Sequence, residues 1–203
     1  MMPTIVHLFF AFTFLFNVTA GVQAARAIDQ VKATADRVIA LLNDPALQGD
    51  DKKAERHRLI RQELDARFDW PEIARGCLGR HWSKRNNDER KEFMALFSEF
   101  LERTYLDRIE PYYADLEKLD FLGEKIIDNY ASVKTVISTK KKIDHPVEYR
   151  LQKTGDEWRV YDVVIEGVSL VKNYRVQFDE IIAKSSYESL IKDIKSKIQT
   201  GTD

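Results

Sequence analysis

The sequence predicts one α+β domain in which helices cover one face of an antiparallel sheet. Apolar residues recur at the helical spacing of three and four from residue 28 to about residue 105, and then at alternate positions up to residue 165. Helical spacing returns after Gly167 and continues to Ile198. A sheet with one apolar face needs helices against that face, so both kinds of segment belong to one core.

Length and composition limit the class of protein. The chain has 203 residues, of which 44% are hydrophobic, and a formal net charge of −1. This length buries a sizeable core, and the hydrophobic content excludes wholesale disorder. Proteins that bind nucleic acids usually carry a basic excess, so the balanced charge argues against a nucleic-acid partner.

Four helices are predicted before the sheet. The first covers residues 28–42 and the second covers residues 58–68. Asp69 is a suitable N-cap for a short third helix, because Pro71 follows it within the first turn. Asn86 opens the fourth and longest helix.

The fourth helix has apolar side chains over about half of its circumference. These side chains are Phe93, Met94, Leu96, Phe97, Phe100, Leu101 and Tyr105. The three phenylalanines supply a broad apolar surface, although each alone is also consistent with ordinary core packing. We expect Pro111 to bend or end this helix, because proline cannot donate the backbone hydrogen bond.

The predicted sheet has four antiparallel strands. They cover residues 119–127, 130–138, 146–152 and 157–165. Turn residues separate the first strand from the second and the third from the fourth. The last strand is apolar on both faces, which predicts a central or covered position. Two helices follow, over residues 170–182 after the cap Ser169 and over residues 187–198.

The N-terminus has the character of a signal peptide. Residues 1–23 contain no Asp, Glu, Lys or Arg, residues 8–16 are mostly apolar, and Val22-Gln23-Ala24 provides small residues for cleavage after Ala24. We therefore expect residues 1–24 to be removed and residues 25–203 to form a single mature domain. The alternative is an uncleaved anchor, but the apolar run is shorter than the ~20 residues that a membrane span needs.

The sequence offers no pattern for metal or cofactor chemistry. His57, His81 and His145 are scattered, without a second ligand at metal-binding spacing. We therefore expect no metal, no cofactor and no catalytic residue. Cys77 is the single cysteine, so the domain has no internal disulfide. It is either a small buried apolar residue or, as the sharper alternative, a reactive thiol.

Two charged features remain. Asp162 lies in an apolar strand, where a carboxylate is costly unless it is paired, and Arg175 on the following helix is the expected partner. The alternatives for Asp162 are a contact with the headgroup of a bound ligand and a catalytic acid. The run Lys140–Lys142 is either a solvated loop or a contact for anionic headgroups or an acidic partner.

Two blocks of sequence carry a resemblance to a known family. The first is residues 161–178, a strand that turns at Gly167 into an amphipathic helix. The second comprises Phe68-Asp69-Trp70-Pro71-Glu72-Ile73-Ala74, then Leu78-Gly79-Arg80-His81-Trp82, and the helix from Glu92 to Tyr105. In this order they resemble the MlaC family, the toluene-tolerance proteins, with weaker similarity from about Ala27 to Ile198. No single motif is a catalytic fingerprint, and the specificity comes from the length of the match.

The resemblance implies a function. Members of this family are soluble periplasmic carriers that shuttle phospholipid between the two membranes of Gram-negative bacteria. It implies phospholipid as ligand and, as partners, an outer-membrane lipoprotein complex and the substrate-binding subunit of an inner-membrane ABC transporter. It also implies an apolar lipid cavity between the helices and the sheet, in a monomer that is not an enzyme.

Candidate lipid-binding residues lie on the apolar faces of the long helix, the sheet and the helix after it. They are Phe93, Phe97, Phe100, Leu101, Tyr105, Val133, Ile137, Val147, Tyr149, Leu151, Val160, Val168 and Val171. Two alternatives stay open. One is a relative that associates with hopanoids or other terpenoid lipids. The other is a small exported enzyme with a cone-shaped fold, similar to the nuclear-transport-factor-like enzymes, that acts through Asp162.

Overall fold

The computed structural model describes the backbone of residues 26–200 and the side chains of residues 26–105 and 115–200. The expected signal peptide, residues 1–24, lies outside this part. The helices are α1 (Ala27–Asn43), α2 (Lys53–Arg67), α3 (Trp70–Leu78), α4 (Asn87–Ala114), α5 (Leu170–Lys184) and α6 (Tyr187–Thr200). Short 3-10 turns cover Pro45–Leu47, Asp50–Lys52 and Gly79–Lys84. Between residues 26 and 200, no helix is both long and apolar enough to cross a bilayer.

The strands form one antiparallel sheet in chain order. They are β1 (Leu116–Ile127), β2 (Tyr130–Thr139), β3 (Asp144–Thr154), β4 (Glu157–Ile165) and β5 (Val168–Ser169). The predicted α+β class is confirmed, but the sheet has five strands and the prediction of four was wrong. The added strand has two residues and pairs with the end of β4, and it is too short to show any alternation in the sequence.

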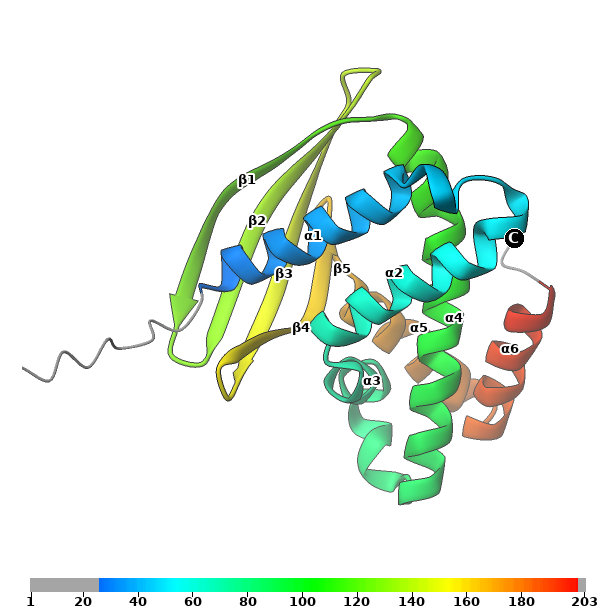
Figure 1. The fold of residues 1–203 in the computed structure, drawn as a ribbon. Helices are drawn as coiled ribbons and strands as arrows, with labels where there is room; N and C mark the ends of the chain where they lie inside the picture. Colours follow the sequence, from blue (N-terminus) through cyan, green and yellow to red (C-terminus); the bar gives the residue numbers. More distant parts are fainter. Residues whose placement is uncertain (1–25, 201–203) are drawn as a thin grey trace, which may run out of the picture.

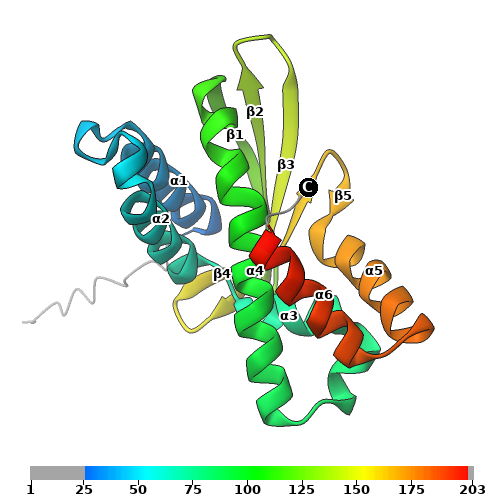
Figure 2. The same cartoon turned by 90° about the vertical axis from the view of Figure 1, so that its right-hand side faces the viewer.

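The layers are visible in two views. Figure 1 shows the sheet on one side of the molecule, α4 and α6 on the other, and α1 beside α2 between them. Figure 2 shows α4 running lengthwise between the α1–α2 pair and α5. Helices α1 and α2 pack against each other as a helical hairpin. This hairpin covers the face of the sheet to which β1 and β2 contribute.

Predicted caps account for several helix ends. The Asp69 carboxylate accepts a hydrogen bond from the Glu72 N–H at 3.0 Å and begins α3. Asn86 Oδ1 accepts from the Glu89 N–H at 2.9 Å, while the Glu89 carboxylate accepts from the Asn86 N–H at 2.7 Å. This reciprocal capping box satisfies donors that the start of a helix leaves unpaired. Pro111 does not end α4, which continues to Ala114.

Most of the aromatic face of α4 packs against α5. Phe97 lies with its ring centroid 5.2 Å from Tyr174 and 5.3 Å from Phe178, in edge-to-face contacts. Phe93 and Phe100 stack on either side of Phe97, at 5.4 and 6.1 Å. These rings belong to a helical core formed by α3, α4, α5 and α6. A second core joins α1 to the sheet through Ala27, Val31, Ala131, Val133, Leu151, Trp158 and Val160.

Asp162 ties β4 to its neighbours on both sides. Its side chain is buried, and its Oδ2 accepts hydrogen bonds from Ser169 Oγ at 2.7 Å and from Arg150 Nη1 at 3.2 Å. Its Oδ1 accepts from the backbone N–H of Val171, in the first turn of α5, at 3.1 Å. A carboxylate at a helix N-terminus is favourable because it faces unpaired N–H groups and the positive end of the helix dipole. The predicted strand–helix tie is present.

The predicted partner of Asp162 was wrong. Arg175 donates from Nε to the Gly76 carbonyl at 2.6 Å, and the cation beside Asp162 is Arg150. The reason is a register shift between β3 and β4, which places Leu151 opposite Val160 but Arg150 opposite Asp162. Residues directly opposite in an antiparallel pair have neighbouring side chains. A bulge of this kind cannot be read from alternation alone.

Replacing Asp162 by asparagine should destabilise the fold. The substitution removes the charge that three donors share, so we expect the free energy of unfolding in urea to fall by about 2 kcal/mol. The matched control is Asp120→Asn, whose carboxylate pairs with Lys118 at a partly exposed site. We expect this variant to change the free energy of unfolding by less than about 0.5 kcal/mol. Equal stability of the two variants would refute the importance of this tie.

Truncating Phe97 should test the helical core. The side chain is fully buried among four aromatic neighbours, so Phe97→Ala should cost about 3–5 kcal/mol of unfolding free energy. Leu122 is 65% exposed, and Leu122→Ala serves as the control with little change in the urea midpoint. A loss below about 1 kcal/mol for Phe97→Ala would contradict the packing described above.

Candidate functional site

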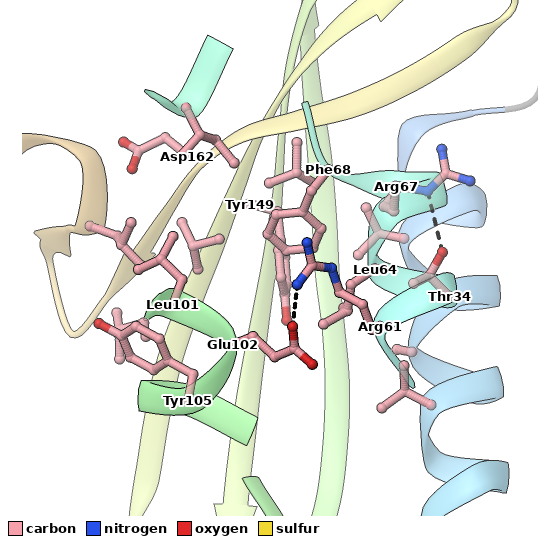
Figure 3. A pocket seen from close by; sticks show the side chains of 18 of the residues that line it. Thr34, Arg61, Leu64, Arg67, Phe68, Leu101, Glu102, Tyr105, Tyr149 and Asp162 are labelled. Atoms are coloured by element: carbon pink, nitrogen blue, oxygen red, sulfur yellow. Dashed lines mark hydrogen bonds and ion pairs between the residues drawn. The ribbon is translucent and has the colours of Figure 1, made fainter. Parts of the chain in front are cut away.

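A cavity of about 390 Å³ lies between the α1–α2 hairpin, α4, the sheet and the start of α5. Figure 3 looks into this space, with Tyr149 and Phe68 at its centre. Its wall is mainly aliphatic. The lining residues include Val38, Ile39, Leu42, Leu64, Leu101, Tyr105, Leu116, Leu119, Ile137, Tyr149, Val160, Val163, Ile165, Leu170 and Val171. The volume lies within the range of ~300–1,000 Å³ that is common for small-molecule sites.

The cavity has its shape because the two cores lie on either side of it. The first two turns of α1 pack on the sheet through Ala27 and Val31, whereas the later turns present Val38 and Leu42 to the cavity. On the other side, the contacts of α4 with α5 hold Leu101 at the cavity wall. Apolar residues therefore face one another across a space that neither core fills.

Few polar groups reach the wall. Thr34, Arg61, Arg67, Glu102 and Asp162 are the polar side chains among the lining residues, apart from Tyr105, Tyr149 and Trp70. Figure 3 shows Arg61 and Glu102 pointing toward one another from α2 and α4, and the structure pairs them as an ion pair.

The two arginines have different surroundings. Burial disfavours the charge of Arg61, but hydrogen bonds to Asp65 and Glu102 outweigh this effect and raise its pKa. Burial lowers the pKa of Arg67, which donates to the Trp158 carbonyl at 2.6 Å and to Thr34 Oγ1 at 3.3 Å. Both guanidiniums stay charged at neutral pH because the ordinary pKa of arginine is above 12.

The residues considered for metal, acid or thiol chemistry can now be placed in the described part of the chain. No group of three or more His, Cys, Asp or Glu side chains there could hold a metal ion. Asp162 uses both oxygens in hydrogen bonds to Arg150, Ser169 and Val171, which favours the structural role over that of a catalytic acid. Cys77 is fully buried in the helical core, and burial raises the pKa of its thiol. This favours the small apolar role over a reactive thiol.

The predicted lipid-binding residues divide into two groups. Six of them line the cavity: Leu101, Tyr105, Ile137, Tyr149, Val160 and Val171. Phe93, Phe97 and Phe100 lie in the helical core, Val133 and Leu151 lie in the sheet core, and Val147 is buried outside both the cavity and these clusters. Val168 is 60% exposed because the two-residue strand β5 leaves its side chain uncovered. Lipid contact by any of the thirteen stays a prediction.

Sequence reasoning missed the wall that α1 and α2 supply. Val38, Ile39 and Leu42 repeat at helical spacing, so the stripe itself was visible. The position of this stripe over the sheet could not be predicted, because it depends on contacts with residues about 100 positions away. The Ile28 N–H, for example, donates to Glu124 at 2.8 Å, across 96 positions of sequence.

Comparisons with known proteins agree with this architecture. A phospholipid-binding protein from Ralstonia solanacearum, solved in complex with a phospholipid, has a similar fold. Its TM-score is 0.76 at 23% identity, and the match covers 86% of this chain and 98% of that chain.

Two curated relatives match shorter stretches. The toluene tolerance protein ttg2D of Pseudomonas putida is 29% identical over 77 residues, which are 38% of this chain and 31% of that protein. The intermembrane phospholipid transport system binding protein MlaC of Haemophilus influenzae is 24% identical over 119 residues, 56% of this chain and 55% of that protein. The matched stretch thus spans about a third of one relative and about half of the other.

The family-level match is broader than either of these. The model of the family described as MlaC protein matches residues 32–196, from the middle of α1 to the end of α6. This range contains the whole sheet and every residue that lines the cavity except Val31. The chain therefore belongs to the MlaC family.

Proposed function

We propose that this protein is a phospholipid carrier that holds acyl chains in the cavity between the α1–α2 hairpin, α4 and the sheet. The aliphatic lining of that cavity is the observation that carries the proposal. The family membership and the functions named for the relatives support it.

The cavity suits the physical task of a carrier. A phospholipid has ~30 methylene groups, and at ~0.8 kcal/mol each its chains oppose passage through water by on the order of 20 kcal/mol. A carrier lowers this barrier by burying the chains in an apolar site and leaving the headgroup near solvent. Binding through apolar contact needs no bond chemistry, which is consistent with an Asp162 that is fully engaged in the fold.

The proposal includes a cellular setting. We place the mature protein in the periplasm after removal of residues 1–24, where it takes lipid from an outer-membrane lipoprotein complex and exchanges it with an inner-membrane ABC transporter. The name of the Haemophilus influenzae relative, an intermembrane phospholipid transport system binding protein, supports this setting. A monomer suffices, since α1, α2, α4, α5 and the sheet of a single chain line the cavity.

Solvent extraction of the purified protein, followed by lipid mass spectrometry, should yield phospholipid. Ile137 lines the cavity, and Ile137→Asn places an amide in an apolar site at a cost of about 1–3 kcal/mol. We expect the variant to retain about tenfold less lipid than the wild type. The control is Val176→Asn, at a position that is 60% exposed on α5, and circular dichroism checks that both variants fold.

Different outcomes of this measurement have different meanings. Recovery of hopanoid or another terpenoid lipid in place of phospholipid would correct the class of cargo but keep the carrier function. A folded wild-type protein without any lipid, and without uptake from vesicles, would overturn the proposal. If the folded Ile137→Asn variant retains as much lipid as the wild type, Ile137 does not contribute to lipid binding.

Export gives a separate test. The uncharged start and the small residues before Ala25 predict that the mature chain begins at Ala25. N-terminal sequencing of protein recovered from the periplasmic fraction should show this residue. An intact Met1 in the membrane fraction would indicate an anchor in place of a cleaved signal peptide.

A further inference from the structure

The α1–α2 hairpin is held together by its own contacts. Leu42 and Ile60 form a small hydrophobic cluster with Val38, Leu41 and Leu64, and this cluster is separate from the helical and sheet cores. Arg37 of α1 also forms an ion pair with Glu63 of α2. Because the two helices share these contacts, they form one packed unit.

One end of this hairpin is fixed to the sheet. At the start of α1, the Glu124 carboxylate accepts from the Ile28 N–H at 2.8 Å, and Gln30 Oε1 accepts from the Trp158 N–H at 3.0 Å. Just after α2, the Asp69 N–H donates to the Val160 carbonyl at 2.8 Å. The two helices run antiparallel, so these attachments lie at the same end of the hairpin, beside the strands in Figure 1.

Away from that end, α2 meets α4 across the cavity through ionic and polar contacts. Arg61 pairs with Glu102 and donates to Ser98 Oγ at 3.2 Å, while its Nε is oriented by Asp65 at 2.7 Å. The Arg61 and Glu102 side chains are 24% and 27% exposed, so water already reaches both. Partly exposed ion pairs are weak, because water replaces either partner at low cost.

We propose that the α1–α2 hairpin is a lid over the cavity and that the Arg61–Glu102 pair is the latch that holds it closed. Opening separates α2 from α4 about the fixed end, which uncovers the apolar wall formed by α4 and the sheet. The lid rests on the proposed carrier function, since it controls the rate at which acyl chains enter and leave. An ionic latch breaks in water without exposing a packed apolar interface.

Weakening the latch should accelerate cargo release. The measurement is the initial rate of transfer of a fluorescent phosphatidylcholine from the loaded protein to neutral phosphatidylcholine vesicles. We expect Glu102→Gln to raise this rate about two- to fivefold, as expected for loss of one partly exposed pair. The matched control is Glu92→Gln, also on α4, whose carboxylate pairs with Lys195 of α6 at 2.7 Å, away from the cavity, and whose rate should stay unchanged.

The latch also predicts coupling between its two members. Arg61→Gln alone should accelerate transfer to a similar extent, and the double variant should be no faster than either single one. Additive acceleration, or equal rates for Glu102→Gln and Glu92→Gln in folded proteins, would overturn the latch.

A tether tests the lid directly and does not depend on the strength of the pair. Arg61→Cys with Glu102→Cys, joined by a flexible bismaleimide in the loaded protein, should lower the transfer rate at least about tenfold. Cys77 is fully buried with a raised thiol pKa, so it does not compete for the reagent. The control tether joins Glu92→Cys to Lys195→Cys and should leave the rate unchanged.

The outcomes separate the lid from the carrier function. If the protein with α2 tethered to α4 transfers lipid as fast as the untethered protein, the lid is refuted. The proposed carrier function would stand in that case, because the protein still carries lipid. Absence of bound lipid in the wild-type protein would refute the carrier function itself. Slow transfer with both tethers would show a general loss of mobility and would also count against the lid.

Discussion

The hydrogen bonds of the Asp162 carboxylate fix the relative position of the two walls of the cavity. This one side chain accepts from β3 through Arg150 and from the start of α5 through Ser169 and Val171. The helix that begins there carries Tyr174 and Phe178, which in turn hold the aromatic face of α4. The distance between the sheet and the helical wall therefore depends on a buried charge. A buried charge is satisfied at few geometries, so this distance is well defined.

Two separate cores allow a folded protein to keep an unfilled apolar space. Protein interiors normally pack to a density that leaves few voids, so a cavity persists only where rigid elements hold its walls apart. Here the rings around Phe97 stiffen the helical side, and Val133, Leu151 and Val160 join the sheet to the first turns of α1. Phe68 packs against both clusters, and the lining on either side of it leaves the rest of the space unfilled. The aliphatic wall is thus a product of packing on both sides of it.

The sequence predicted the elements well and their contacts less well. Caps at Asp69, Asn86 and Ser169 are local signals, and the structure confirms each of them. The apolar face of α4 was predicted correctly, but periodicity does not say what covers a face. Phe93, Phe97 and Phe100, which were predicted to bind lipid, pack in the helical core, and their contact with lipid stays a prediction. The partner of Asp162 was missed because a single register shift between β3 and β4 changes every cross-strand neighbour beyond it.

The topology of the sheet has a consequence for how the chain folds. Each of the strands β1 to β4 pairs with the next one along the chain, so the sheet assembles from short loops, whereas the Arg26–Glu124 contact of α1 spans 98 positions. Contacts between distant positions form late, because loop closure is costly until other contacts exist. We therefore expect the sheet to form first, with its apolar face exposed to solvent until α1 packs against it. During this interval the chain is most open to aggregation and to capture by a chaperone.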